Sequence, residues 1–217
     1  MLVVGLLVHR LVVSPFETNC YIAACPPRSL GDESTRNALI IDPGDEAHLI
    51  SDAAYGLDVT VIGIVNTHGH ADHIGSNAAL KGEFDCPIMI HESDAPMLTD
   101  PQANLSASLG SGIISCPADR LLKEGDEIAV GGLAFRVIHT PGHTPGGICL
   151  FGEGVLFSGD TLFMDGIGRT DFPGGSQKQL MDSIHNKLLD FPETTLVYPG
   201  HGPETTIGRE KIENPWL

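Results

Sequence analysis

The chain has 217 residues, of which 41% are hydrophobic and 18% are charged, so it can bury a sizeable core and is not expected to be disordered. Lys and Arg number 12 against 28 Asp and Glu, which gives a net charge of −16. This balance lacks the positive field that nucleic acids and anionic membrane surfaces require, so neither is an expected partner. The length fits a single domain over residues 1–217.

The start of the chain and its cysteines indicate a cytoplasmic protein. Residues 1–8 are apolar but lack a basic leader and a small-residue cleavage site, so a first strand is expected there rather than a signal peptide. The five cysteines are scattered and odd in number, which favours reduced thiols over a disulfide framework. No apolar run approaches the ~18 residues that span a bilayer.

Short runs of β-branched residues bounded by Gly, Pro, Asn and Asp predict most of the elements as strands. The predicted strands are 2–13, 20–24, 38–41, 59–66, 87–91, 127–138, 147–151, 154–158 and 195–198. The predicted helices are 45–55, 72–80 and 176–189, and Ser176 is the expected N-cap of the last. The Gly/Ser-rich stretch 101–117 is predicted to be a loop or a mobile flap. Strands outnumber helices and both types mix along the chain, which indicates layered α and β structure rather than a helical bundle.

Four potential metal ligands, His68, His70, Asp72 and His73, directly follow the predicted strand 59–66. Gly69 lets the chain turn sharply, so that His68 and His70 point the same way while the other two lie at the start of the next helix. Three imidazoles and one carboxylate suit a borderline divalent metal such as zinc, with iron and manganese as alternatives. The competing interpretation is a solvated His-rich turn without a metal.

His143, Asp160 and His201 each follow a later predicted strand, and a glycine turns the chain beside each of them. All four ligand-bearing stretches therefore leave the C-terminal end of an apolar strand. Open α/β sheets gather their ligands at this edge. We expect the seven side chains to converge in one cleft.

Five histidines and two aspartates are more than one tetrahedral ion can use, whereas two ions that share a carboxylate account for all seven. We assign the first ion to His68, His70 and His143, the second ion to Asp72, His73 and His201, and the bridge to Asp160. Each ion then keeps an open position for a shared water, as a catalytic site requires.

The remaining candidates lack a companion motif. His9, His48, His91 and His185 are expected to be structural or on the surface, and His139 to lie in the core or to support a ligand. Asp42 ends the predicted strand 38–41. It either accepts the second ring proton of a ligating imidazole or forms an Asx turn that ends the strand.

The ordered set from His68 to His201 resembles the metallo-β-lactamase superfamily, as do the segments Asn19-Cys20-Tyr21 and Ile41-Asp42-Pro43-Gly44. The resemblance implies an α/β fold. This would be a four-layer αββα sandwich, with two mixed β-sheets face to face, helices outside and a metal site at one edge.

Within the superfamily, residues 159–163, 168–175 and 198–207 are most similar to glyoxalase II-like hydroxyacylglutathione hydrolases. Full-length members carry a C-terminal helical domain that contacts glutathione. Here only sixteen residues follow His201, so no such domain is expected. Arg169 stands where the family has a Lys or Arg near the glutathione glycine, which makes it a candidate substrate contact. Asp171 replaces a nearby tyrosine of the family motif.

The resemblance implies a metal-dependent hydrolase of a small-molecule thioester such as an S-2-hydroxyacylglutathione. The expected reaction is attack by a hydroxide that bridges the two ions and that Asp72 holds by a hydrogen bond. A thiolate leaves readily because its thiol has a pKa of ~8.5, so no strong general acid is needed. The alternatives are a mononuclear-iron persulfide dioxygenase, which residues 168–172 also resemble, a lactonase, lactamase or phosphodiesterase of the same fold, and a catalytically silent binding protein.

Overall fold

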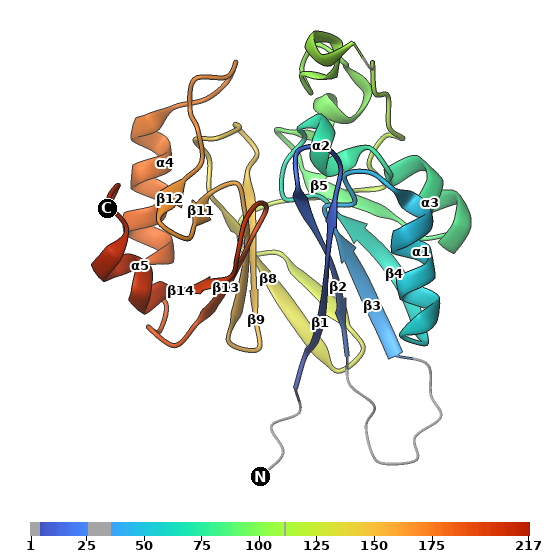
Figure 1. Ribbon diagram of the computed structural model, residues 1–217, viewed down its shortest axis with the longest axis horizontal. Coiled ribbons are helices and arrows are strands. Elements are labelled where there is room, and N and C mark those ends of the chain that lie inside the picture. The colour runs from blue at the N-terminus through green and yellow to red at the C-terminus, as the bar shows by residue number, and fades with distance from the viewer. Residues whose placement is uncertain (1–4, 26–35, 111) are drawn as a thin grey trace.

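The computed structural model describes residues 5–25, 36–110 and 112–217. Two six-stranded sheets lie in the middle of the molecule, with helices on both outer sides (Figure 1). The predicted strand 2–13 begins outside the described residues, and its described part forms a strand from Leu7.

The first sheet has the strand order β1-β2-β3-β4-β5-β6. Strands β1 to β3 are antiparallel, whereas β3 to β6 run parallel. Its strands are β1 Leu7–Val13, β2 Thr18–Ala24, β3 Arg36–Ile41, β4 Val59–Val65, β5 Ile88–His91 and β6 Arg120–Leu122.

The second sheet has the order β14-β13-β10-β9-β8-β7 and is also mixed, because β10 and β13 are parallel while the other neighbours are antiparallel. Its strands are β7 Glu127–Val130, β8 Leu133–His139, β9 Ile148–Gly152, β10 Val155–Gly159, β13 Leu196–Pro199 and β14 Thr205–Thr206. The short strands β11 Leu162–Phe163 and β12 Gly166–Ile167 form a separate ribbon.

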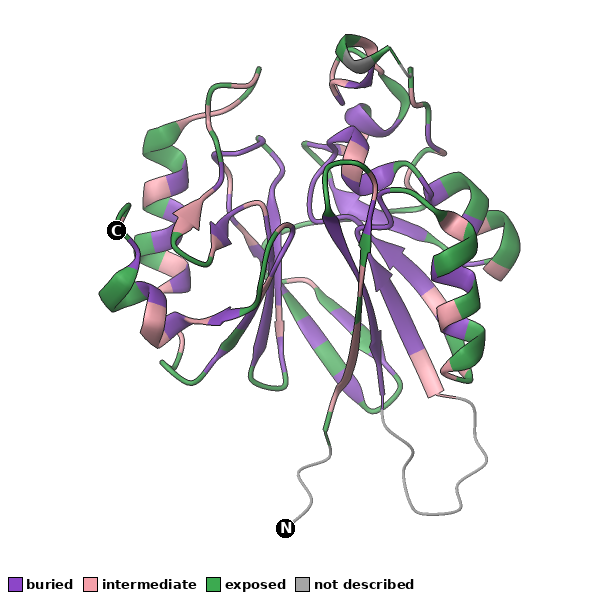
Figure 2. Ribbon diagram, viewed as in Figure 1, coloured by how far each residue is buried: buried purple, intermediate pink, exposed green. Residues whose placement is uncertain are grey.

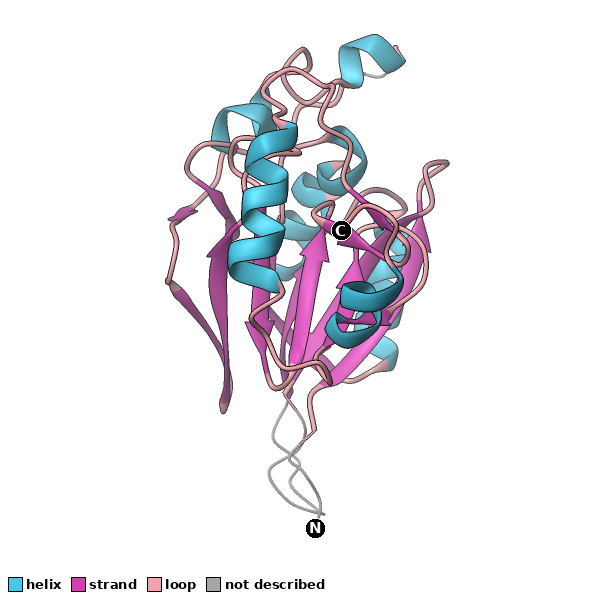
Figure 3. Cartoon of the chain, turned by 90° about the vertical axis from the view of Figure 1, so that its left-hand side faces the viewer, coloured by secondary structure: helices cyan, strands magenta, loops and turns pink. Residues whose placement is uncertain are grey.

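Helices cover the outer face of each sheet (Figure 3). They are α1 Ala47–Gly56, α2 Ala71–Ile74, α3 Asn77–Phe84, α4 Gln177–Ser183, which continues as a π-helical turn over Ile184–Leu188, and α5 Ile207–Glu213. Two 3₁₀ turns span Ala95–Thr99 and Ser106–Leu109. The predicted cap of α4 is confirmed, because the Ser176 side chain accepts a hydrogen bond from the Gln179 N–H.

Three apolar clusters hold the layers together, and the strands carry most of the buried residues (Figure 2). Leu39 and Val65 of the first sheet face Phe135 and Phe157 of the second. On the outer faces, α1 and α3 pack on the first sheet, and α4 with its π-helical turn and α5 pack on the second. The four-layer αββα sandwich with two mixed sheets is therefore confirmed.

Two predicted elements are divided in the structure. Residues 127–138 form the hairpin β7–β8, because Gly131 adopts a left-handed φ of 60° and lets the chain turn between Val130 and Leu133. The predicted helix 72–80 breaks into α2 and α3, because the Ser76 N–H donates to Pro43 O at 2.9 Å and so leaves the helical hydrogen-bond pattern. The first break follows from a local turn and the second from a hydrogen bond to a distant segment of the chain, and strand and helix periodicity reports neither.

No helix in the described ranges is long and apolar enough to cross a bilayer. Cys20, Cys86 and Cys149 are buried free thiols, and Cys116 is a half-buried one.

Candidate metal centre

The seven predicted side chains lie at one edge of the sandwich, where strands of both sheets end. The His68–His73 segment leaves β4 of the first sheet. His143, Asp160 and His201 leave β8, β10 and β13 of the second sheet. Strands β8 and β10 are both antiparallel to β9, and β13 is parallel to β10. Strands β8, β10 and β13 therefore all end at the same edge of the second sheet. The structure thus brings together all seven side chains.

The first group consists of His68, His70 and His143. One nitrogen from each lies within 4.8 Å of the others. His70 Nδ1 is 2.9 Å from His143 Nε2, and all three residues are buried. This is the set that we assigned to the first ion.

The second group consists of Asp72, His73 and His201, whose ligand atoms also lie within 4.8 Å of one another. The Nε2 atoms of His73 and His201 are 3.3 Å apart. Asp72 Oδ2 lies 3.5 Å from the first of these nitrogens and 3.3 Å from the second. This is the set that we assigned to the second ion.

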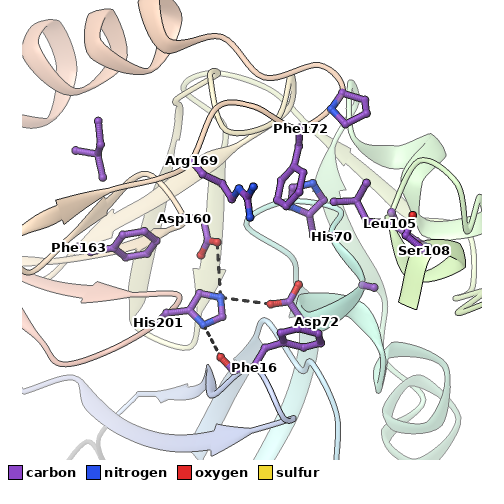
Figure 4. Close-up of a pocket in the computed structure, with 14 residues that line it drawn as sticks. Phe16, His70, Asp72, Leu105, Ser108, Asp160, Phe163, Arg169, Phe172 and His201 are labelled. Atoms are coloured by element: carbon purple, nitrogen blue, oxygen red, sulfur yellow. Dashed lines mark hydrogen bonds and ion pairs between the residues drawn. The ribbon is translucent and has the colours of Figure 1, made fainter. Parts of the chain in front are cut away.

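Asp160 contacts both groups, and Figure 4 shows its carboxylate facing His201 at the edge of the cavity. Its Oδ1 is 3.5 Å from His73 Nε2 in the second group. Its Oδ2 is 3.5 Å from His143 Nε2 in the first group and 3.6 Å from His201 Nε2. This position fits the bridging role that the sequence predicts.

The donor set fits divalent metal ions. His68 Nε2 and Asp160 Oδ1 are buried and have no hydrogen-bond partner. Buried polar atoms in folded proteins nearly always have a partner, and a cation would supply one for these two atoms. Imidazole nitrogens and carboxylate oxygens gathered this closely are the donors that zinc, iron and manganese accept.

The second ring nitrogen of three histidines faces an oxygen that only accepts hydrogen bonds. His73 Nδ1 lies 3.1 Å from Asp42 Oδ2. Arg169 O is 2.7 Å from Nδ1 of His143, and Phe16 O is 3.0 Å from Nδ1 of His201. The two carbonyl oxygens hold the ring protons of His143 and His201 on Nδ1, so the Nε2 atoms of these two residues present a lone pair to the cluster. His73 Nδ1 faces Asp42 without a hydrogen bond of regular geometry.

Asp42 lies where the orienting role requires it, and this is one of the two roles that we considered for it. Besides facing His73, it accepts hydrogen bonds from the Thr67 N–H at 2.7 Å and the Thr67 hydroxyl at 2.6 Å. It thus joins the end of β3 to the turn that carries the first histidines.

The two innermost histidines are held neutral. Burial lowers the pKa of His68 well below its usual value. Burial and the neighbouring His143 lower the pKa of His70 to about 3. Both imidazoles therefore offer unprotonated nitrogens at neutral pH, which metal ligation requires.

In the second group, the carboxylates of Asp72 and Asp160 favour the charged form of the neighbouring histidine. Burial disfavours the charged form of His73, but Asp72 and Asp160 outweigh it and raise its pKa to about 10. Burial also opposes the ionised form of Asp72, yet His73 and a hydrogen bond from His201 lower its pKa. This group therefore concentrates negative charge that a cation can balance.

Asp94 is a supporting residue that the sequence analysis missed. It is fully buried, and its carboxylate accepts from Gly69 N–H at 3.1 Å, Thr144 Oγ1 at 2.6 Å and Gly146 N–H at 2.6 Å. It thereby ties the turn of His70 to the turn after β8. Its only signal in the sequence is its place three residues after the predicted strand 87–91.

The Asn19-Cys20-Tyr21 segment supports the turn that carries His201. Asn19 Nδ2 donates to the carbonyl oxygens of Pro199 and Gly202 at 2.9 and 2.8 Å, and Tyr21 donates to Pro199 O at 2.7 Å. Glycine is required at position 200, because a methyl group there would overlap Asp160 Oδ1.

A third set of donors within 4.8 Å of one another, His68, His73 and Asp160, connects the two groups, and the other histidines lie outside all three sets. The rings of His91 and His139 stack on each other with centroids 4.0 Å apart, and His139 Nε2 lies 3.0 Å from Pro145 O. This pair joins the ends of β5 and β8, a structural position in the fold.

The cluster opens into a cavity of about 720 Å³. Figure 4 shows His70, Asp72, Asp160 and His201 facing it. Its apolar walls are Phe16, Ala71, Leu105, Phe163, Ile167, Phe172 and Pro173. The predicted loop 101–117 contributes Asn104, Leu105 and Ser108, so it shapes the cavity, and the buried Asn104 side chain ties it down by donating to Met97 O and Ile113 O.

A family model described as the Metallo-beta-lactamase superfamily matches residues 15–201. The chain belongs to the metallo-β-lactamase superfamily. Among superfamily relatives, the chain is 37% identical over 214 residues to hydroxyacylglutathione hydrolase GloC of Haemophilus influenzae, and the match covers 97% of each chain. It is 38% identical over 212 residues to "Probable metallo-hydrolase YqgX" of Bacillus subtilis, which covers 96% of each.

Solved structures of the superfamily share the fold. BLEG-1, a B3 metallo-beta-lactamase, is 40% identical with a TM-score of 0.89, over 97% of this chain and 99% of BLEG-1. TTHA1623 in a di-iron-bound form is 33% identical with a TM-score of 0.80, over 97% of this chain and all of TTHA1623. Family membership and the histidine–aspartate cluster together identify this chain as a metallo-hydrolase of the superfamily, with a cluster suited to divalent metal.

Proposed function

We propose that this chain is a binuclear metal-dependent thioester hydrolase, with S-2-hydroxyacylglutathiones as the first substrates to test. The observation that carries the proposal is the pair of three-residue ligand groups, joined by Asp160, at the mouth of an apolar cavity. The same cavity gives a small acyl thioester room beside the cluster.

One ion would be held by His68, His70 and His143, the other by Asp72, His73 and His201, and both by Asp160. When bound, such ions lower the pKa of a coordinated water from ~15.7 towards ~7 and polarise a carbonyl group. Zinc suits this donor set, and the di-iron form of TTHA1623 supports iron as the alternative.

Asp72 is the residue that we propose to orient the attacking water. Its Oδ2 accepts a hydrogen bond from Thr18 Oγ1 at 3.1 Å, and its lowered pKa keeps the carboxylate ionised. An ionised Oδ2 at the edge of the cavity accepts a proton of the water that adds to the carbonyl carbon. The C–S bond then breaks and its electron pair leaves on sulfur as a thiolate. The thiolate takes a proton from solvent, while the proton on Asp72 and that of the new carboxylic acid pass to solvent, so a carboxylate and a thiol are the products.

The cavity favours an easily displaced leaving group. Its acidic side chains, among the described residues that line it, are Asp72 and Asp160, and both belong to the cluster. An amine or alcohol leaving group would need a proton donor that these lining residues do not supply. A thiolate leaves without one, because its thiol has a pKa of ~8.5.

The likeness to GloC supports the same substrate class. The chain covers 97% of that relative, which is named a hydroxyacylglutathione hydrolase. The match extends through the segments that carry the cluster.

The decisive experiment is a steady-state screen of the purified protein loaded separately with zinc, iron and manganese. The panel contains S-lactoylglutathione, an aryl thioester, a lactone, a β-lactam and, with oxygen uptake as the signal, glutathione persulfide. We expect the highest kcat/KM for a thioester. A higher value for the lactone or β-lactam, or oxygen uptake by the iron form without thioester cleavage, would overturn the proposal.

A further inference from the structure

Thr18, the first residue of β2, lies against the second ligand group. Its Oγ1 donates a hydrogen bond to Asp72 Oδ2 at 3.1 Å. Its backbone forms an antiparallel bridge with His201. Thr18 therefore contacts two of the three members of this group. It is also fully buried, so bulk water does not compete for its hydroxyl.

The chain before and after this threonine supports His201 as well. Phe16 O lies 3.0 Å from His201 Nδ1, and Figure 4 shows Phe16 and Asp72 joined to the same imidazole ring. Asn19 N–H donates to Gly200 O at 2.7 Å, in the turn that carries the histidine. The turn between β1 and β2 thus faces two ligands that lie far apart in the sequence.

A second hydroxyl fixes the direction in which Thr18 donates. Ser14 Oγ lies 3.3 Å from Thr18 Oγ1. A threonine hydroxyl has a single hydrogen, and the ionised carboxylate of Asp72 can only accept. Thr18 therefore gives its hydrogen to Asp72, and Ser14 is the donor in the contact with Thr18. This chain of two hydroxyls holds the Asp72 carboxylate with Oδ2 towards the Nε2 atoms of His73 and His201.

The first ligand group is supported by other parts of the chain. Asp94 joins the turn of His70 to the turn that carries His143, and Arg169 O faces His143 Nδ1. None of the hydrogen bonds of Thr18 named above reaches a member of that group. The two groups therefore rest on separate supports.

We propose that Thr18 is a positioning residue for the second ion. By fixing the Asp72 carboxylate, its hydroxyl sets the metal affinity of the second ligand group and leaves that of the first unchanged. The inference rests on the proposed binuclear centre and deepens it, because it makes the affinities of the two ions separable. Residues that hydrogen-bond a metal ligand from behind change metal affinity by about 10- to 100-fold.

The test uses two variants of this position. Thr18→Val removes the hydroxyl but keeps the branched shape, whereas Thr18→Ser keeps the hydroxyl. Titration of the metal-free proteins with zinc, in competition with a chelator, gives a Kd for each equivalent. In Thr18→Val, we expect the Kd of one equivalent to rise about 10- to 100-fold and the other to stay unchanged, with most of the loss restored in Thr18→Ser. The unchanged equivalent also shows that Thr18→Val is folded.

Thr205→Val is the matched control. Thr205 is also a buried threonine that donates to a carboxylate, that of Glu210, but it lies on β14 outside the ligand groups. Its replacement should leave both Kd values unchanged. His201→Ala locates the affected ion, because it removes a ligand of the second group. In that background, Thr18→Val should not change the Kd of the ion that remains.

Several outcomes would overturn the inference while the proposed thioesterase stands. These are equal zinc affinities of Thr18→Val and wild type, equal weakening of both equivalents, and a Thr18→Ser protein as weak as Thr18→Val. A wild type that binds two zinc ions but cleaves no thioester would refute only the proposed function. A wild type that takes up a single ion would refute the binuclear centre and the inference together.

Discussion

The cavity has a floor, formed by the seven donor side chains of the cluster, and walls, formed by the other residues that line it. The two parts differ in how they are held in place. On the floor, four of the five histidines are buried, and Asp42, Arg169 O and Phe16 O face the second ring nitrogen of three of them. The walls come from loops, from the β11–β12 ribbon and from α2, and they carry exposed side chains such as Phe16 and the Arg169–Asp171 pair. The floor can therefore hold its donors in one geometry, while the walls can change without disturbing it.

This difference suggests how the fold serves different substrates. Ligands on strand ends are fixed by packing and by hydrogen bonds from residues behind them. Substitution of those residues lowers the affinity for metal. Wall residues on loops contribute contacts that are small and separable. Substitutions on the floor should change metal content and kcat/KM, whereas substitutions on the walls should change KM.

The largest effect is expected for Asp160→Ala on the floor. Loss of the carboxylate that contacts both ligand groups should reduce metal content and lower kcat/KM on the order of 10³-fold, because several kcal/mol of transition-state stabilisation depend on the metal. Elemental analysis and steady-state kinetics are the measurements, with Asp182→Ala on α4 as the control. An Asp160→Ala protein with full metal content and full activity would refute the bridging assignment.

Asp42→Asn tests whether the outer contacts hold the floor in place. An amide cannot accept all the hydrogen bonds that come from Thr67 and His73, so His73 loses its orientation. We expect the metal Kd to rise about 10- to 100-fold, with activity restored by excess metal. Asp58→Asn is the matched control, because Asp58 also has a left-handed φ, of 53°, but is exposed. Equal metal affinity in both variants would contradict the orienting role.

Removal of metal from the floor should lower the thermal stability of the protein. Ions that bind only the folded state stabilise it by about 2.7 kcal/mol at a free concentration of one hundred times Kd. For a chain of this size, chelation should therefore lower Tm by about 5–10 °C, and metal should restore it. Differential scanning calorimetry measures the shift. Asp160→Ala should show a smaller metal-dependent shift, and an equal shift in both proteins would place the bound metal elsewhere.

The smallest effect is expected for the wall. Leu105→Ala removes an apolar side chain that lines the cavity, and it should raise KM for an apolar thioester about fivefold, because part of the ~0.8 kcal/mol per buried CH₂ is lost. Metal content should stay equal to that of wild type. Leu121→Ala, at an exposed position of β6, should leave KM unchanged. A loss of metal from Leu105→Ala would show that floor and wall are not separable.

The sequence predicted which segments converge at this edge of the sandwich, because each combines a local pattern with a position at a strand end. His68, His143, Asp160 and His201 all follow apolar runs that the structure has as β4, β8, β10 and β13. The runs are identifiable by composition, and the glycines beside the ligands mark the turns. Both kinds of signal come from neighbours in the chain.

The supporting residues were harder to find for a physical reason. Asp94 stands alone in its segment, and its role arises from hydrogen bonds to Gly69 and Gly146, which lie 25 and 52 residues away. The sequence left two roles open for Asp42, an acceptor for a ligating imidazole or an Asx turn. Its distance of 3.1 Å to His73 Nδ1 in the structure favours the first. Contacts of this range depend on how the two sheets pack and leave no periodic signal.

By itself the sequence determined which segments carry clustered metal-type donors and which strands precede them, because residue type, glycine turns and apolar runs are local properties of the chain. Only the tertiary structure decided the distances between the seven donors, which acceptors face the second ring nitrogens of the imidazoles, and that Asp171 engages Arg169 beside the cavity. These features depend on distances between segments from two sheets and several loops, and such distances exist only once the layers have packed.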